Sequence, residues 1–292
     1  MKLKRIIKST LKNFYPLITG EKKKAVKTES TSKKQQERKP RVPRKKLFIC
    51  VDEENLHLCG PWTTKEFNKW KKDTLNNNPD LVVIADSKYH NKKFLIPIWE
   101  IDDLEILQHI QLSNLDTSDI QNMNSFFSEL FNIADIDVSK FNTSKVWNME
   151  CLFDRCESVS SLDLSNFDTS MVKTMDSMFY NCQSLEKIDL SSFNTSQVES
   201  MSHMFSCCTN LISLDLSNFN TKNVRDMSSM FDHCIYLNTI NLSNFNIDPS
   251  CETTCMFEEC NDLETIILKN CSPVTIARIK EEIEDFDVKL IV

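Results

Sequence analysis

The residues best suited to chemistry are carboxylates that recur at an interval of 26 residues. Asp137, Asp163, Asp189 and Asp215 share one position of this interval, and Asn241 follows at the next. A row of carboxylates attracts cations, so three interpretations remain open: a cationic protein or peptide, divalent metal ions, or a solvated face without a ligand. Such a row also repels itself, and we expect its neutralisation to leave the fold intact or slightly more stable.

A neighbouring position at the same interval changes its chemistry from repeat to repeat. Variable side chains beside a fixed scaffold are typical of positions that set specificity. This position is occupied by Asp135, Ser161, Lys187, Ser213 and Thr239. We therefore add Lys187 to the candidate binding residues.

Cysteine supplies the next candidates, and twelve are present. Five share a single position of the interval, which indicates a small buried hydrophobe in a reducing compartment rather than disulfides; these are Cys156, Cys182, Cys208, Cys234 and Cys260. Two further groups contain zinc-binding atoms without a recognised ligand spacing; they are Cys50, His57, Cys59 and His90, and Cys251, Cys255 and Cys260. We predict no metal site and no cofactor.

Signals for catalysis are missing from the sequence. The chain has only two glycines, Gly20 and Gly60, so neither a P-loop nor a dinucleotide-binding fingerprint can be formed. An HExxH motif, a nucleophile elbow and a Cys/His pair in a recognised context are also absent. We therefore predict that the protein is not an enzyme and has no catalytic residues.

Residues 1–46 are strongly basic, with seventeen Lys and Arg against three Glu, a net charge of +14. An apolar pattern near helical spacing in the first eighteen residues, followed by a polybasic stretch, favours an anionic membrane surface. Binding to nucleic acid through KPRVPRKK, docking on the acidic body and a solvated tail are the alternatives. The candidate contacts are Lys2, Lys4, Arg5, Lys8, Lys12, Lys22, Lys23, Lys24, Arg41, Arg44, Lys45 and Lys46.

The elements that must position these residues follow from the repeat itself. Phenylalanine recurs every 26 residues, for example at Phe153, Phe179 and Phe205, and a period of this length indicates a solenoid. In LDLS, apolar residues alternate with polar ones, which predicts a short strand in each coil. The run from Val172 to Cys182 has helical spacing, so we predict about two helical turns after Asp168, Thr169 and Ser170 as N-caps.

Another polar position is interpreted as structural. Asx side chains there can close turns and satisfy backbone groups between coils. The series is Asp116, Asn142, Asp168, Asn194, Asn220 and Asn246.

Four regions are predicted along the chain. Residues 1–46 form a basic, largely disordered tail with an amphipathic start, and residues 47–100 form a small α/β N-terminal cap with a capping box at Thr63 and Glu66. Residues 101–271 form the solenoid of 26-residue repeats, and residues 272–292 form a helix–strand C-terminal cap. The fold class is an α/β solenoid.

The repeats also resemble a known family. LDLSNFDTS, VKTMDSMFYNC and LDLSNFNTKNVRDMSSMFDHC are similar to the leucine-rich-type repeats of BspA-like proteins, also described as DUF285 repeats, over residues 101–271. The resemblance implies a right-handed, leucine-rich-repeat-like coil of short parallel strands and short helices, with the Asp row on a concave sheet. It also implies a binding surface, often on exported proteins that adhere to matrix or host proteins.

These observations favour a non-enzymatic protein–protein interaction module that binds a partner through the concave sheet face. The alternative is a protein whose basic arm binds a membrane or, less favoured, nucleic acid, with the solenoid as a spacer. Lys8 and Lys12 interrupt the apolar pattern of the first eighteen residues, which differs from a secretory signal. We therefore expect a cytoplasmic location or the inner face of the membrane, whereas the resemblance implies the cell surface.

Overall fold

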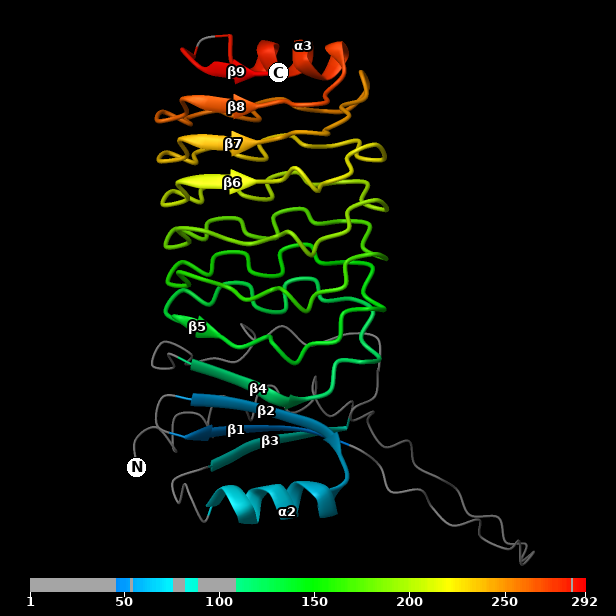
Figure 1. Ribbon diagram of the computed structural model, residues 1–292. Helices are drawn as coiled ribbons and strands as arrows, with labels where there is room; N and C mark the ends of the chain where they lie inside the picture. Colours follow the sequence, from blue (N-terminus) through cyan, green and yellow to red (C-terminus); the bar gives the residue numbers. More distant parts are fainter. Residues whose placement is uncertain (1–45, 53–54, 76–81, 89–108, 285) are drawn as a thin grey trace, which may run out of the picture.

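The computed structural model describes residues 46–52, 55–75, 82–88, 109–284 and 286–292. It is a solenoid in which coils of 26 residues stack into one column, with a strand-rich layer at one end and a helix and a strand at the other (Figure 1). The predicted basic tail, apart from Lys46, lies outside the described residues, and so do parts of the predicted N-terminal cap.

The N-terminal layer continues the sheet of the solenoid. Strand β1 (Lys46–Asp52) pairs antiparallel with β2 (Asn55–Trp62) and with β3 (Val82–Lys88). Strand β2 then pairs in parallel with β4 (His109–Leu115), and β4 with β5 (Asp135–Ile136), in the order β3-β1-β2-β4-β5. The first coil therefore stacks on a paired strand rather than on solvent.

Helix α2 (Thr64–Leu75) lies at this end and begins at the predicted capping box. The Thr63 amide donates to the Glu66 carboxylate at 2.6 Å, and the Glu66 amide donates to the Thr63 hydroxyl at 3.3 Å. Two amides that a helix start leaves unpaired are thus satisfied. Phe67 anchors the helix because its side chain is buried.

Short parallel strands form where the LDLS-type segments predict them. Strands β6 (Ser213–Asp215), β7 (Thr239–Asn241) and β8 (Thr265–Ile267) pair in exact 26-residue register, and β9 (Lys289–Ile291) pairs with β8. The central residue of each of β6, β7 and β8 is buried between two outward-facing ones. Residues 161–163 and 187–189 hold the same position without strand assignment.

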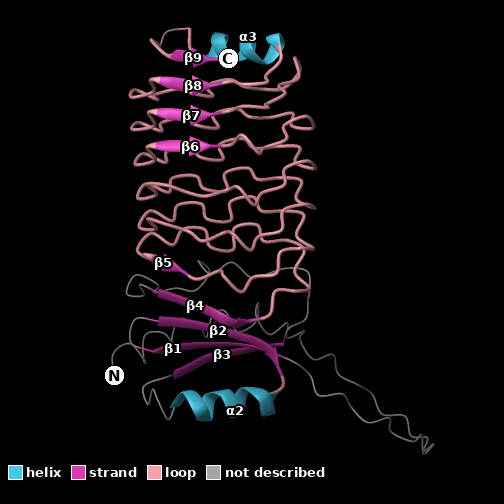
Figure 2. Ribbon diagram, in the orientation of Figure 1, coloured by secondary structure: helices cyan, strands magenta, loops and turns pink. Residues whose placement is uncertain are grey.

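The helices predicted within the coils are wrong. No helix is present between residues 109 and 272, a stretch that is described throughout, and most of each coil is drawn as loop (Figure 2). In the run of Cys151, Phe153 and Arg155, each amide donates to a carbonyl in the next coil at 2.7–2.9 Å. Intervening amides, such as that of Asp154, bond three residues back. We call residues 148–156 and their equivalents at 26-residue intervals the turn ladder.

The turn ladder also needs backbone conformations that a helix excludes. Ser177 and Asn181 have φ of 54° and 58°, in the left-handed region, and the equivalent residues of every coil from Ser125 to Glu259 do the same. Without a helix, Asp168, Thr169 and Ser170 are not N-caps. The apolar residues of the run are nevertheless buried as expected, including Met175, Phe179 and others at that spacing.

Phenylalanine stacks form the centre of the column. Rings of Phe127, Phe153, Phe179, Phe205 and Phe231 lie 5.2–5.9 Å from their neighbours, with interplanar angles of 3–14°. Because the same ring repeats once per coil, each coil completes the core of the next. The stability of one coil therefore depends on its neighbours in the stack.

A buried threonine in each coil adds a polar connection between coils. The Thr195 hydroxyl donates to the Asn220 carbonyl at 3.1 Å and accepts from the Asn220 amide at 2.7 Å. The same pair of bonds links Thr117, Thr143, Thr169 and Thr221 to the following coil. This column of hydroxyls satisfies backbone groups that a corner would leave unpaired.

The C-terminal end is closed by helix α3 (Pro273–Glu282), which starts with Ser272 as its N-cap. Arg278 on this helix donates to the Cys251 carbonyl at 2.7 Å and to the Thr253 hydroxyl at 2.8 Å. Glu282 accepts from the same hydroxyl at 2.6 Å. On its outer side, the last coil is therefore bonded to the helix rather than to another coil.

Candidate recognition surface

The candidate surface is built by the outward-facing side chains of the short strands. Asp163, Asp189 and Asp215 are exposed, while Asp137 and Asn241 at the two ends of the row are partly exposed. Lys187 is also exposed, one coil above Ser161. Neighbouring strands lie about 4.8 Å apart, so the row spans four such steps. We call these six residues together the Asp face.

Each carboxylate of the Asp face is held by its own backbone. The amides of Ser165, Ser191 and Ser217 donate to Asp163, Asp189 and Asp215 at 2.9–3.1 Å. The same bond from residue i+2 occurs at Asp137, at 3.0 Å, and at Asn241, at 3.1 Å. These bonds fix the direction in which the side chains point, because an Asx side chain that closes its own turn loses its rotamer freedom.

The hydrogen bonds also keep the carboxylates ionised. The hydroxyl and amide of Ser165 lower the pKa of Asp163 below its ordinary value, and those of Ser191 do the same for Asp189. At Asp215, burial raises the pKa, but bonds from Ser217 and Asn241 outweigh it and leave the pKa lowered. Repulsion between Asp163 and Asp189 is the smallest contribution at Asp189. The expected repulsion is thus present between these two carboxylates, but the hydrogen bonds outweigh it at Asp189.

Positive charge does not compensate the row within the described part of the chain. The ion pairs found there lie elsewhere: Lys145 pairs with Asp119 at 2.9 Å and Lys173 with Glu199 at 3.6 Å. Lys187 lies among the carboxylates, but it forms no ion pair with them there. The Asp face thus presents ordered negative charge to solvent.

Two exposed apolar side chains adjoin the acidic row and escaped the sequence analysis. Ile212 precedes β6 and is 57% exposed, and Tyr236 precedes β7 and is 53% exposed. Backbone bonds hold both residues to neighbouring coils: the Asn238 amide donates to the Ile212 carbonyl at 2.9 Å, and the Tyr236 amide donates to the Thr209 carbonyl at 3.3 Å. Both stand at positions that are polar in the neighbouring coils, such as Glu186 and Asn210, and this departure from the repeat is the signal that could have revealed them.

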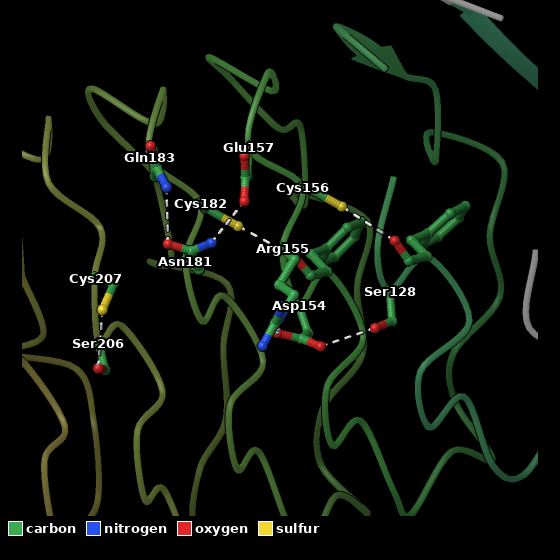
Figure 3. Close-up of polar contacts among 12 residues, drawn as sticks. Ser128, Asp154, Arg155, Cys156, Glu157, Asn181, Cys182, Gln183, Ser206 and Cys207 are labelled. Carbon is green, nitrogen blue, oxygen red and sulfur yellow. Dashed lines mark hydrogen bonds and ion pairs between the residues drawn. The ribbon is translucent and has the colours of Figure 1, made fainter. Parts of the chain in front are cut away.

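A second polar cluster lies on the turn ladder. Ser128 donates to Asp154 at 2.8 Å, and Asn181 donates to Glu157 at 2.8 Å (Figure 3). Burial raises the pKa of Asp154, although Ser128 and Arg155 oppose this. Each of these bonds joins neighbouring coils, so we assign the cluster to the stack. Sequence reasoning missed it because the positions vary in type.

The same ladder continues into a cysteine and an acid–histidine pair. The Nδ1 atom of His233 lies 2.5 Å from Asp232, a contact that raises the pKa of His233. Ser206 donates to Asp232 at 3.3 Å, and Cys207 lies in the same column as His233 one coil earlier. The Cys207 sulfur lies 3.7 Å from the Ser206 hydroxyl.

The repeated cysteines are packing residues, as predicted. Cys182 is a free thiol, is fully buried and donates to the Phe153 carbonyl at 3.2 Å. Burial raises the pKa of the Cys182 thiol, and burial also raises the pKa of Cys208, to about 12. The same thiol-to-carbonyl bond is made by Cys156, Cys208, Cys234 and Cys260. Neutral buried thiols are poor ligands and poor nucleophiles.

Metal sites are not indicated where the structure can be read. Among the described residues, no group of three His, Cys, Asp or Glu is arranged to hold an ion. Cys251 and Cys260 are buried while Cys255 is exposed. Cys50 pairs with His57 across the β1–β2 hairpin, and His90 lies outside the described residues.

The turn-closing role of the other Asx series is confirmed for its first five members. The amides of Ser118, Ser144, Ser170, Ser196 and Lys222 donate to the Asx side chain two residues earlier, at 3.0–3.2 Å. Asn246 keeps the bond from its amide to the Thr221 hydroxyl, at 2.8 Å, that other members of the series also make, but residue 248 donates no turn bond to its side chain.

The candidate contacts of the basic tail fall outside the described residues except for Lys46, the first residue of β1. Among the residues that can be examined, no helix has the length and apolar character needed to cross a bilayer.

Comparison with known proteins gives a family but little else. No curated protein matches the chain. A solved leucine-rich repeat protein from Bacteroides ovatus aligns with 15% identity and a TM-score of 0.31, over 58% of this chain. The chain spans about half, 51%, of that protein's length. The family model described as "Mycoplasma protein of unknown function, DUF285" matches residues 101–211 and 185–282, more than half of the chain. The chain therefore belongs to the DUF285 family.

Proposed function

We propose that the protein is a non-enzymatic recognition module that binds a protein partner through the Asp face. The observation that carries this proposal is the row of carboxylates held ionised and oriented by Ser165, Ser191 and Ser217. A partner segment with basic residues could pair with several of them at once. Because the side chains are already ordered, binding loses little rotamer entropy.

The exposed apolar pair adds a second requirement to the partner. Ile212 and Tyr236 are large side chains beside the row, and aromatic residues are enriched among those that dominate binding energy. The partner we propose is therefore a basic segment that also carries apolar residues. Charge would set its approach and register, whereas the apolar contact would slow its release.

The experiment compares two sets of variants with the same loss of charge. The first carries Asp163→Asn, Asp189→Asn and Asp215→Asn on the Asp face; the second carries Glu129→Gln, Glu199→Gln and Glu258→Gln, exposed acids within or beside the turn ladder. Binding of a Lys- and Leu-containing peptide is measured by fluorescence anisotropy at physiological salt. We expect about a tenfold or larger loss in the first set and less than about twofold in the second. Equal losses would show non-specific attraction to net charge.

A second candidate function follows from the sequence of the arm. The net charge of +14 over residues 1–46 suits an anionic membrane, with the solenoid as a spacer. In that case, changing Lys22, Lys23 and Lys24 to Gln in the full chain should lower binding to vesicles containing phosphatidylserine. Binding that is equally strong to neutral vesicles would reject this function, and stronger salt-sensitive binding to nucleic acid would replace the membrane with that ligand. A location in the cytoplasm or at the inner face of the membrane is part of this proposal.

A further inference from the structure

We propose that the chain's own N-terminal arm, residues 1–46, occupies the Asp face and competes there with an external partner. This inference rests on the same surface as the proposed function. It adds a regulatory element, because the arm would have to leave before the partner binds. The charge of the arm, its apolar residues and its length all fit this surface.

Charge complementarity is the first argument. The arm holds seventeen Lys and Arg against three Glu. The Asp face holds carboxylates whose pKa values are lowered at Asp163, Asp189 and Asp215, so they remain ionised at neutral pH. None of them forms an ion pair with a described residue, whereas exposed acids such as Asp119 and Glu199 do. The largest block of positive charge in the sequence and this row of carboxylates are thus complementary in charge.

Apolar composition is the second argument. Ile212 and Tyr236 beside the Asp face are more than half exposed. The first eighteen residues of the arm alternate basic with large apolar side chains, which include Leu3, Ile6, Ile7, Leu11, Phe14, Leu17 and Ile18. One segment can therefore supply both kinds of contact. A purely polar basic tail would leave the apolar pair uncovered.

Reach is the third argument. The arm joins the structure at Lys46, the first residue of β1, and the strand order β1-β2-β4-β5 leads directly into the coils. Six strand spacings separate β1 from β6, a distance of about 29 Å at 4.8 Å each. The 45 residues before Lys46 have a fully extended length of about 150 Å, well above this distance. The arm can reach the whole Asp face, at an effective concentration in the millimolar range.

The test is a zero-length carbodiimide cross-link on the full chain at micromolar concentration, with linked peptides mapped by mass spectrometry. We expect lysines of the arm to join Asp163, Asp189 or Asp215, with a yield that does not change on tenfold dilution and falls at high salt. The three Asn substitutions on the Asp face remove the principal linkage sites. The total yield of cross-links from arm lysines should therefore drop several-fold. The matched Glu129, Glu199 and Glu258 set should leave the Asp-face links unchanged. Links that favour those three glutamates, or that disappear on dilution, would overturn the inference.

A second measurement separates the arm's two possible anionic partners. If the Asp face holds the arm, the three Asn substitutions should release it and tighten binding of the full chain to vesicles with a quarter phosphatidylserine by about threefold or more relative to the matched Glu129, Glu199 and Glu258 set, which removes the same negative charge. Unchanged or weaker binding would overturn the inference. Failure of this inference is distinguishable from failure of the proposed function. If the arm does not bind the Asp face, the three Asn substitutions should still weaken binding of the external peptide.

Discussion

The two sides of each coil hold the stack together by different means. On the sheet side, short strands such as β6 and β7 pair in register, and the outward side chains are free to meet solvent. On the turn ladder, amides such as those of Met149 and Phe153 bond into the next coil, and polar side chains also bond across coils. We infer that the ladder maintains the stack while the sheet presents the chemistry.

The largest expected effect tests the ladder through its core. Phe205 stacks between Phe179 at 5.4 Å and Phe231 at 5.9 Å and is fully buried. Phe205→Ala should destabilise the protein by about 3–5 kcal/mol, because it leaves a cavity between two coils. Urea unfolding followed by circular dichroism measures the loss. Ile212→Ala, at an exposed position, is the control; equal effects of both would contradict the stack.

The threonine column provides a second test at the corner between the two sides. Thr195→Val keeps the shape but removes the hydroxyl that both accepts from the Asn220 amide and donates to its carbonyl. Two partly buried backbone groups of Asn220 lose their partner, so we expect about 1–3 kcal/mol of destabilisation. Thr195→Ser should recover most of it in the same unfolding measurement. A fully stable valine variant would show that these bonds do not contribute.

A smaller effect of the opposite sign should appear at the left-handed positions of the ladder. Ser229 has φ of 53°, a conformation that glycine adopts without cost. Ser229→Gly should raise the free energy of unfolding by up to about 1 kcal/mol, and Ser229→Val should lower it by about 1–2 kcal/mol. Thermal melts of the two variants check this. The reverse order would mean that this backbone is not left-handed in solution.

The smallest effect concerns pH and the Asp face. Hydrogen bonds lower the folded-state pKa of Asp163 and Asp189, so ionisation favours the folded state above the unfolded pKa near 3.9. This contribution is lost as pH falls through the folded pKa. The three Asn substitutions should therefore lower stability slightly at pH 7, and the difference from the unsubstituted protein should shrink below about pH 4. The urea midpoints of both proteins are measured at pH 7 and below about pH 4. A difference in midpoint that is the same at both pH values would contradict the lowered pKa values.

Much of the solenoid could be predicted because a repeat fixes which side chains face inward. Leu164, Met175 and Cys182 are buried as the alignment of coils requires, and the parallel strands follow from alternation in LDLS. The prediction of helices was wrong because apolar spacings of three, three, one and three are compatible with both an α-helix and the turn ladder. Only backbone conformation separates them. The twelve left-handed positions of the turn ladder, from Ser125 to Glu259, contain no β-branched residue, which is the signal that favoured turns.

The candidate site was only partly visible in the sequence. The Asp positions could be assigned to the outward side of the strands from alternation alone. The bonds from Ser165 and Ser191, which decide whether the carboxylates are strained or stabilised, depend on turn geometry after each strand. Ile212 and Tyr236 also stayed hidden, because their exposure depends on where the coil bends.

Photo-cross-linking is the most direct test of recognition by the Asp face. A basic peptide that carries leucines and one benzophenone group is irradiated with the full chain, and the attachment sites are mapped by mass spectrometry. Our account predicts attachment within residues 135–139, 161–165, 187–191 and 212–217 and at Tyr236, with competition by the unlabelled peptide. Competable attachment concentrated on the turn ladder, around Arg155, Cys207 and His233, would contradict it.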